Sequence, residues 1–257
     1  MSEPARLVHP AAQAFGAVAD QYERARPDYP QAAIDLLAER LGIGPTATVV
    51  DVAAGTGKLT RRLVPLAERV VAVEPVAGMR ERLAATVPGA EVLAGTAECI
   101  PLPDGAADAA TVAQAFHWFR GDEALAELHR VLRPGGSLGL LWARRDLDQP
   151  LQAEITRIVR GYRGTAPAHR GDAWRAAFRA RADLFGPLAE GRMRFRQRLD
   201  GDGLVARVGS MSFVAALPAE RRADVLGRVR ALVASPTEAV ELAYVGEVLW
   251  CERRERG

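Results

Sequence analysis

The chain has 257 residues, of which 49% are hydrophobic and 26% charged, enough apolar material for a full globular core. The 34 basic residues nearly balance the 32 acidic ones, so the formal charge of +2 creates no strong field for nucleic acid. No apolar run has the length of a signal peptide or of a membrane span. Cys99 and Cys251 lack the spacing of a metal site and suit a reducing compartment. We therefore predict a cytoplasmic protein without metal, membrane or nucleic-acid partners.

The first half of the chain alternates predicted strands with predicted helices. A helix over 31–41 is expected to end at Gly42, and Pro65 is expected to end or kink the helix that begins near Gly57. Asp122 is expected to cap a later helix. Strands are predicted at about 47–52, 69–74, 91–95, 109–116 and 137–142. Because the loops between them are short, the strands should run parallel with right-handed crossovers.

The second half of the chain has a different pattern. Residues 192–199 alternate between arginines and mostly apolar side chains, which predicts an edge strand with one solvated face. A helix is expected over 218–233. The strand predicted next, over 240–251, is apolar on both faces, as a central strand would be. The 146–190 segment is expected to be a helical insertion.

The most informative segment is the turn that follows the first strand. Asp51 closes the strand, and the small residues Ala53, Gly55 and Gly57 lead into the next helix. Glycines leave the backbone open to a ligand, and ligands bind at the carboxyl ends of strands in open α/β sheets. This pattern predicts a nucleotide-type ligand at the turn.

Two common nucleotide-binding loops do not match the turn. A dinucleotide fingerprint requires a third glycine where Thr60 stands. A P-loop requires a glycine in place of Val52 and a Ser or Thr in place of Leu59. The remaining pattern, strand–Asp–x–Ala–x–Gly–Thr–Gly–helix, resembles the first motif of the class I S-adenosylmethionine-dependent methyltransferases.

A second segment, residues 94–119, strengthens this resemblance. It is similar to the segment that holds adenine in those enzymes, with Thr96 standing where many relatives carry an acid. Residues 130–141 resemble the third motif of the family. The chain is similar to methyltransferase type 11 domains, in a subgroup near the trans-aconitate methyltransferases. The matching positions of the adenine segment are Gly95, Ala97, Glu98, Pro101, Pro103, Asp104 and Asp108.

The resemblance implies a doubly wound, Rossmann-like α/β sheet. Its seven strands would carry helices on both faces, and the last strand would lie antiparallel beside the fifth. We expect a single domain over 1–257. Its parts are an N-terminal lid over 10–30, a cofactor-binding core over 45–145, a helical substrate-cap insertion over 146–190, and C-terminal strands with a helix over 191–257.

The resemblance also implies roles for individual residues. Glu74, at the end of the second strand, would accept hydrogen bonds from two ribose hydroxyls, although an acid at this spacing also occurs in dinucleotide enzymes. Arg26 in the lid is expected to pair with a carboxylate of the cofactor or the acceptor, and His117 is the candidate general base. His129 is expected at the surface. The expected cofactor-binding residues are Tyr22, Asp51, Ala53, Gly55, Gly57, Glu74, Pro75, Met79, Thr96, Ala97, Glu98, Gln114 and Ala115.

These expectations describe an enzyme that uses S-adenosylmethionine, releases S-adenosylhomocysteine and methylates a small molecule. The acceptor atom (oxygen, nitrogen or carbon) stays open, as does the choice between monomer and homodimer. Methyl transfer depends chiefly on alignment, and a base is needed only when the nucleophile holds a proton. Two alternatives remain: a non-methylating reaction with the same cofactor, and a nicotinamide-dependent oxidoreductase, which the missing third glycine argues against.

Overall fold

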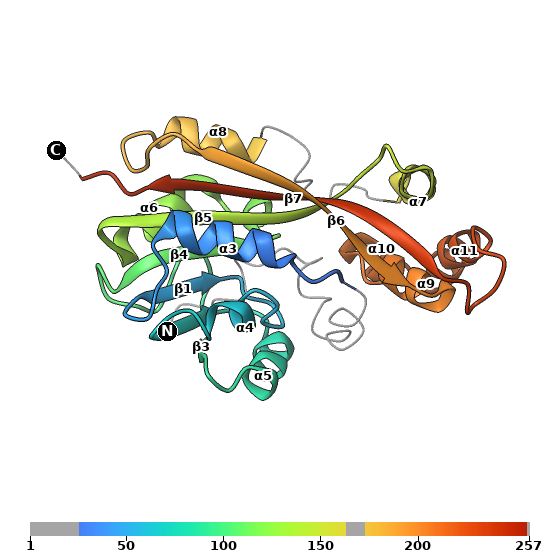
Figure 1. The fold of residues 1–257 in the computed structure, drawn as a ribbon, viewed down its shortest axis with the longest axis horizontal. Coiled ribbons are helices and arrows are strands. Elements are labelled where there is room, and N and C mark those ends of the chain that lie inside the picture. Colours follow the sequence, from blue (N-terminus) through green and yellow to red (C-terminus); the bar gives the residue numbers. More distant parts are fainter. Residues whose placement is uncertain (1–25, 163–172, 256–257) are drawn as a thin grey trace.

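Figure 1 shows the computed structural model, which describes residues 26–162 and 173–255. The described residues form a seven-stranded sheet in the order β3-β2-β1-β4-β5-β7-β6. The strands are β1 (Thr48–Val52), β2 (Arg69–Val73), β3 (Glu91–Leu93), β4 (Ala107–Ala113), β5 (Leu132–Arg145), β6 (Ala189–Leu199) and β7 (Val240–Glu252). The helices are α3 (Gln31–Leu41), α4 (Thr60–Leu63), α5 (Ala77–Thr86), the 3-10 helix η3 (Phe116–Trp118), α6 (Gly121–Val131), α7 (Pro150–Arg160), α8 (Ala173–Ala180), α9 (Gly201–Gly209), α10 (Ser212–Ala215) and α11 (Ala219–Arg230).

The direction of the strands confirms the predicted sheet. Neighbouring strands from β3 through β5 run parallel to one another. β7 runs antiparallel to β5 on one side and to β6 on the other, so the arginine-rich strand β6 is the edge. The fold is therefore the Rossmann-like α/β sheet, with the last strand antiparallel beside the fifth.

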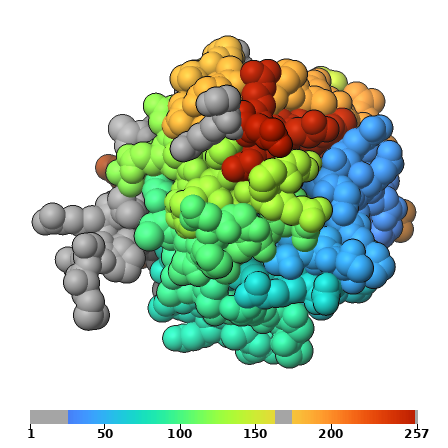
Figure 2. Space-filling view, turned by 90° about the vertical axis from the view of Figure 1, so that its left-hand side faces the viewer, coloured from blue at the N-terminus to red at the C-terminus, as the bar shows by residue number. Residues whose placement is uncertain are grey.

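The two faces of the sheet carry different helices. Successive residues of a strand point to opposite faces, so Val49 packs with α3 and α4 while Val50 packs with α6 and α8. Figure 2 shows α3, in blue, beside the C-terminal part of β7, in red, and these two elements are in contact. Nowhere in the described ranges does a helix combine the length and the apolar character that a membrane crossing requires.

Two predicted helix ends are confirmed. α3 ends at Gly42, whose φ of 65° is the left-handed conformation that glycine adopts without strain. The next backbone N–H, of Ile43, donates to the Ala38 carbonyl at 2.9 Å. α4 ends at Leu63, before Pro65.

A separate apolar cluster lies where the C-terminal end of β6 and the N-terminal end of β7 meet the helices on the right of Figure 1. Leu204 of α9 and Val225 of α11 are buried there with Tyr244 of β7. α7 packs into this cluster, whereas α8 packs on α6 and η3. The predicted insertion over 146–190 is therefore divided between two parts of the molecule, and its end already belongs to β6. The sequence predicts α11 but neither α9 nor α10.

Two expectations about α6 are wrong. Its N-cap is Arg120, and Asp122 lies within the first turn. The Arg120 N–H is instead satisfied from a distant part of the chain, because it donates to Glu98 Oε1 at 2.9 Å. His129 is 2% exposed rather than at the surface, and its Nε2 lies 2.9 Å from the Arg254 carbonyl oxygen. The C-terminal end of the described chain thus packs against α6.

Candidate functional site

The carboxyl ends of β1 and β4 meet where the order of the strands reverses, the usual place for a ligand in an open α/β sheet. Ala53 follows β1 with a φ of 55°, and Gln114 follows β4 with a φ of 59°. Over the described ranges these are the two non-glycine residues with positive φ. Such backbone strain clusters at functional sites. The Gln114 N–H donates to the Leu141 carbonyl at 2.8 Å and so fixes this conformation.

A cavity opens beside these two turns. The space between the residues of its wall, which is open to solvent at its mouth, measures about 530 Å³. The part of its wall that the structure describes includes three basic residues, Arg26, Lys58 and Arg207, and no acidic residue. The wall therefore favours an anionic group. The other described lining residues are Pro27, Tyr29, Ala53, Ala54, Gly55, Thr56, Leu59, Ala113, Gln114 and Ala143.

Glu74 follows β2 and reaches the turn after β1. It is 4% exposed, and its Oε2 accepts from the Gly55 N–H while its Oε1 accepts from the Val76 N–H, both at 2.9 Å. Burial raises the pKa of this carboxyl, and the two backbone N–H groups oppose that shift. Each carboxylate oxygen has a further lone pair. Glu74 can therefore accept two hydroxyl groups of a ribose while it remains bonded to the backbone.

Asp51 lies in β1 beneath the turn and is 1% exposed. Its Oδ2 accepts from Thr60 Oγ1 at 2.7 Å, and its Oδ1 accepts from Thr111 Oγ1 at 2.9 Å. Burial raises the pKa of this carboxyl to about 6. These two bonds tie α4 and β4 to β1. A direct contact between Asp51 and the cofactor stays a prediction.

The two glycines of the turn meet different requirements. Gly55 has a φ of 60° and Gly57 a φ of 85°, where other residues are strained. A Cβ at Gly55 would meet Met79 Sδ at 3.6 Å, an ordinary contact. A Cβ at Gly57 would lie 3.0 Å from both Leu83 Cγ and Val87 Cγ2. Sequence reasoning explained both glycines by ligand access, and the structure adds that Gly57 makes room for the packing of α5.

Predicted site residues after β2 also support the turn. The Arg80 guanidinium donates through Nη1 to the carbonyl oxygens of Glu74 and Pro75, at 2.9 and 2.7 Å. Met79 is 4% exposed and lies beneath Gly55. Pro75 and Met79 thus shape the site through the backbone and through packing.

The loop after β3 carries the predicted adenine contacts. Thr96 and Cys99 exchange two backbone hydrogen bonds at 3.2 Å, which close a tight turn. Thr96 is 5% exposed, and its Oγ1 has no hydrogen-bond partner in the described chain, which fits a hydroxyl that a ligand satisfies. Ala97 is buried in the core. Glu98 accepts from the Arg120 N–H, so this carboxylate supports the start of α6.

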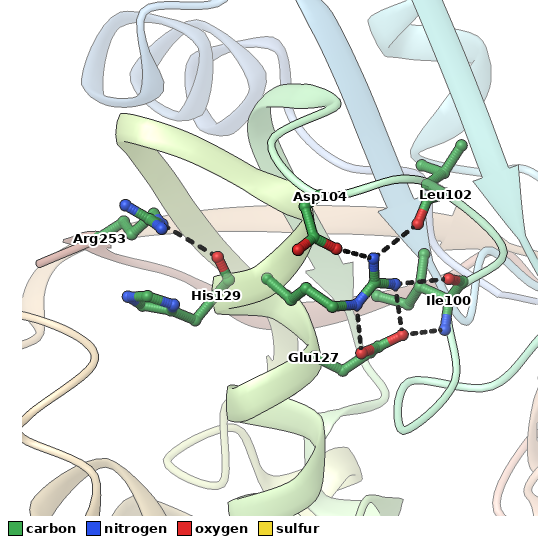
Figure 3. A network of polar contacts seen from close by, with 7 residues as sticks. Ile100, Leu102, Asp104, Glu127, His129 and Arg253 are labelled. Carbon is green, nitrogen blue, oxygen red and sulfur yellow. Dashed lines mark hydrogen bonds and ion pairs between the residues drawn. The ribbon is translucent and has the colours of Figure 1, made fainter. Parts of the chain in front are cut away.

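Arg130 of α6 braces this loop, and Figure 3 shows the residues around its guanidinium. It donates to the carbonyl oxygens of Ile100 and Leu102, at 3.0 and 2.8 Å. It also donates to Asp104 Oδ1 at 2.8 Å and to Glu127. Glu127 Oε1 in turn accepts from the Ile100 N–H at 2.8 Å. Helix α6 thus fixes the backbone of the loop after β3, which we call the predicted adenine loop, through a single ion-pair network.

Two arginines of the cavity wall are associated with α9: Arg207 lies on this helix, and Arg26 contacts the residue that follows it. Arg26 Nη2 donates to the Ser210 carbonyl at 3.3 Å, directly after α9. Arg207, on α9, is 6% exposed, and its Nε donates to Tyr244 Oη at 3.1 Å. Sequence reasoning predicted Arg26 and missed Arg207, because it did not predict α9. The available signal was a single arginine inside the apolar run over 204–208.

Two further predicted site residues, His117 and Ala115, do not line the cavity in the described ranges. His117 lies in η3 with its ring centroid 5.3 Å from that of Trp118, and it is not among the described residues of the cavity wall. Its role as a base stays a prediction. Ala115 packs against the core. Tyr22 and most of the predicted lid over 10–30 lie outside the described residues.

A sheet of this order, with a glycine turn after β1 and a buried acid after β2, defines the class of Rossmann-like enzymes that bind a nucleoside-containing cofactor. Known proteins narrow this class. A family model described as a methyltransferase domain matches residues 50–140. An uncharacterised methyltransferase of Mycobacterium tuberculosis is 40% identical over 226 residues, which are 86% of this chain and 86% of the relative.

Solved structures agree with this result. One from Anaeromyxobacter dehalogenans, a proposed type II methyltransferase, has 26% identity and a TM-score of 0.64, covering 88% of this chain and 97% of that one. Geranyl diphosphate methyltransferase, solved in complex with S-adenosylmethionine, shares the fold at 16% identity and a TM-score of 0.50, covering 87% and 85%. The chain belongs to the methyltransferase family, and this membership implies S-adenosylmethionine as cofactor.

Proposed function

We propose that this chain binds S-adenosylmethionine at the carboxyl ends of β1 and β2 and methylates a small molecule in the adjoining cavity. The observation that carries this proposal is Glu74, a buried carboxylate whose two oxygens are aligned by the N–H groups of Gly55 and Val76. When bound, the cofactor supplies an electrophilic methyl group. The chain then contributes binding, alignment and the exclusion of water.

The loop after β3 supports the same cofactor. Its buried Thr96 hydroxyl, which has no partner within the described ranges, can hydrogen-bond the adenine ring. We also propose that the chain belongs to a subgroup near the trans-aconitate methyltransferases. It would act in the cytoplasm as a monomer or a homodimer. His117 would serve as base only for an acceptor that must lose a proton.

The position of Thr60 argues against a nicotinamide cofactor. A dinucleotide fingerprint needs glycine there, because the helix and the strand pack closely at that point. Thr60 is fully buried, and its hydroxyl is bonded to Asp51. The side chain fills the space that the fingerprint leaves empty.

Calorimetry with the purified protein tests the cofactor. S-adenosylmethionine and S-adenosylhomocysteine should bind, and NAD should not. Each hydrogen bond to a charged group contributes about 1.5–3 kcal/mol. Glu74→Ala should therefore weaken the affinity for S-adenosylhomocysteine at least tenfold, a loss of about 1.4 kcal/mol or more.

Glu91→Ala is the matched control. Glu91 lies on β3, the strand next to β2, and is exposed with an ion pair to Arg69. It should bind S-adenosylhomocysteine with wild-type affinity. Unchanged affinity in a folded Glu74→Ala protein would remove Glu74 from the site, and tight binding of NAD would contradict the proposed cofactor.

A further inference from the structure

The strongest unexplained feature of the cavity is the burial of Arg207. Its side chain lies on α9 in the wall of the cavity, and the residue is only 6% exposed. Arginine stays protonated in proteins and is almost never buried without a partner. The cost of burying an unpaired charge is high.

Among the described residues, Arg207 has one neutral hydrogen-bond partner. Nε donates to Tyr244 Oη at 3.1 Å, and Tyr244 Oη donates to Gln197 Oε1 at 3.2 Å. The guanidinium carbon also lies 5.9 Å from the centroid of the Tyr244 ring. The Nη1 group is buried and has no hydrogen-bond partner in the part of the chain that the structure describes. This chain of bonds fixes the Nε side of the guanidinium and leaves Nη1 unsatisfied.

No carboxylate of the described chain compensates this charge. The ion pairs of Arg144 and Arg192 converge on Glu247, farther along β7, and none of the ion pairs between described residues includes Arg207. The described cavity wall likewise contains no acidic side chain. A buried planar guanidinium that lacks a carboxylate partner matches the carboxylate of a ligand, which can accept two parallel N–H bonds.

The position of Arg207 in the chain indicates which ligand carries that carboxylate. The family model covers residues 50–140, which include the turn over 53–57, Glu74 and the predicted adenine loop. This segment therefore carries the proposed cofactor contacts. Arg207 lies outside it, on a helix that reaches the cavity from the C-terminal cluster.

We propose that the methyl acceptor is a small organic acid and that Arg207 binds its carboxylate. This inference rests on the proposed function, because it names the acceptor class of the same site. S-adenosylmethionine also carries a carboxylate, at its amino-acid end. The experiment therefore has to separate a carboxylate of the acceptor from that of the cofactor.

The test compares wild-type protein with Arg207→Met, which keeps the length of the side chain, and Arg207→Lys, which keeps the charge but loses the fork. Arg198→Met is the control, since Arg198 is 89% exposed on the edge strand β6. Methyl-labelled S-adenosylmethionine is incubated with a small-molecule extract that an anion exchanger has divided into acidic and neutral pools. Calorimetry measures binding of S-adenosylhomocysteine and of 5′-methylthioadenosine, which lacks the amino-acid end.

The wild-type protein and Arg198→Met should label a compound of the acidic pool. Arg207→Met should raise the apparent KM for that compound at least tenfold, and Arg207→Lys should raise it less. Affinity for S-adenosylhomocysteine should stay within twofold in all variants. Since Arg207→Met removes an uncompensated buried charge, its melting temperature should be no lower than that of the wild type.

Three results would overturn this inference. The first is label in the neutral pool alone, or no label in the acidic pool. The second is a KM in Arg207→Lys and Arg207→Met equal to that of the wild type. The third is a tenfold loss of S-adenosylhomocysteine affinity in Arg207→Met with unchanged affinity for 5′-methylthioadenosine, which would assign the guanidinium to the cofactor. A wild-type protein that binds neither adenosyl compound would instead refute the proposed function itself.

Discussion

Asp51 and Arg207 are two charged side chains buried near one cavity, and their surroundings differ. The Asp51 carboxylate accepts hydroxyl groups from Thr60 and Thr111, so both of its oxygens are satisfied by the protein. Arg207 donates to one tyrosine hydroxyl, and its Nη1 is left without a partner among the described residues. A satisfied buried charge holds the sheet together. An unsatisfied one at a cavity wall indicates a ligand.

The same difference separates the two halves of the molecule. In the half from β1 to β5, the buried charged groups of Asp51 and Glu74 are hydrogen-bonded within the protein. The helices that pack on the C-terminal end of β6 and the N-terminal end of β7 contribute Arg207 to the same cavity, from outside the residues that the family model matches. We infer that the first half serves the cofactor and the second selects the acceptor.

The largest effect on stability is expected from close packing at the glycine turn after β1. Gly57→Ala adds a methyl group 3.0 Å from Leu83 and Val87 at a φ of 85°. Left-handed backbone costs other residues about 1–2 kcal/mol, and overpacking adds about 1–3 kcal/mol. Urea unfolding should show a loss of about 3 kcal/mol.

Gly135→Ala is the control that isolates the backbone contribution. Gly135 has a φ of 76°, and a Cβ there would meet no atom within 4 Å. This variant should lose only about 1 kcal/mol. Equal losses in the two variants would show that the packing of the turn against α5 is not tight.

The sequence predicted the first half of the chain well because its signals are local. Hydrophobic runs, Gly42 and the acid after β2 each act within a few residues of the chain. The failures have non-local causes. The Arg120 N–H is capped by Glu98, and His129 is buried by the Arg254 backbone, neither of which is adjacent in sequence.

α9 was missed because its sequence is a poor local signal for a helix. Gly201, Gly203 and Gly209 weaken helix propensity, and burial of Leu204 in the C-terminal cluster compensates for them. The N-cap Asp200 accepts from the Gly203 N–H, a signal that sequence reasoning overlooked. Since the helix was not predicted, no position in the site could be assigned to its arginine.

The next largest effect should come from Asp51, the buried charge whose two oxygens are satisfied by the protein. Burial moves the pKa of Asp51 from 3.8 to about 6, so the folded state binds a proton more tightly than the unfolded state. This contribution to stability is full below pH 4 and is lost as the pH rises through 6. The shift corresponds to about 3 kcal/mol at most. Asp51→Asn should remove this part of the decline in stability and leave the part due to Glu74, whose pKa is also raised by burial. Urea unfolding between pH 4 and 7.5 would detect the difference.

Arg207→Met provides the contrast for Asp51→Asn. Arginine does not titrate in this range, so the stability difference between Arg207→Met and wild type should be the same at every pH. If Asp51→Asn retains the full wild-type decline in stability between pH 4 and 6, then Asp51 does not contribute to it, and Glu74 is the remaining buried carboxyl with a raised pKa.

The smallest effect should come from the brace of the predicted adenine loop, and it tests whether the two halves of the site act separately. Arg130→Met removes the bonds to Ile100, Leu102 and Glu127, but the guanidinium is partly solvated, so the expected loss is about 1 kcal/mol. The looser loop should also bind S-adenosylhomocysteine several-fold more weakly in calorimetry. Arg133→Met, which removes an ion pair with Asp108 away from the loop, should leave that affinity unchanged. Equal affinity in the two variants would mean that the brace does not position the cofactor. A loss in Arg130→Met alone, beside an unchanged affinity in Arg207→Met, would separate cofactor binding from acceptor recognition.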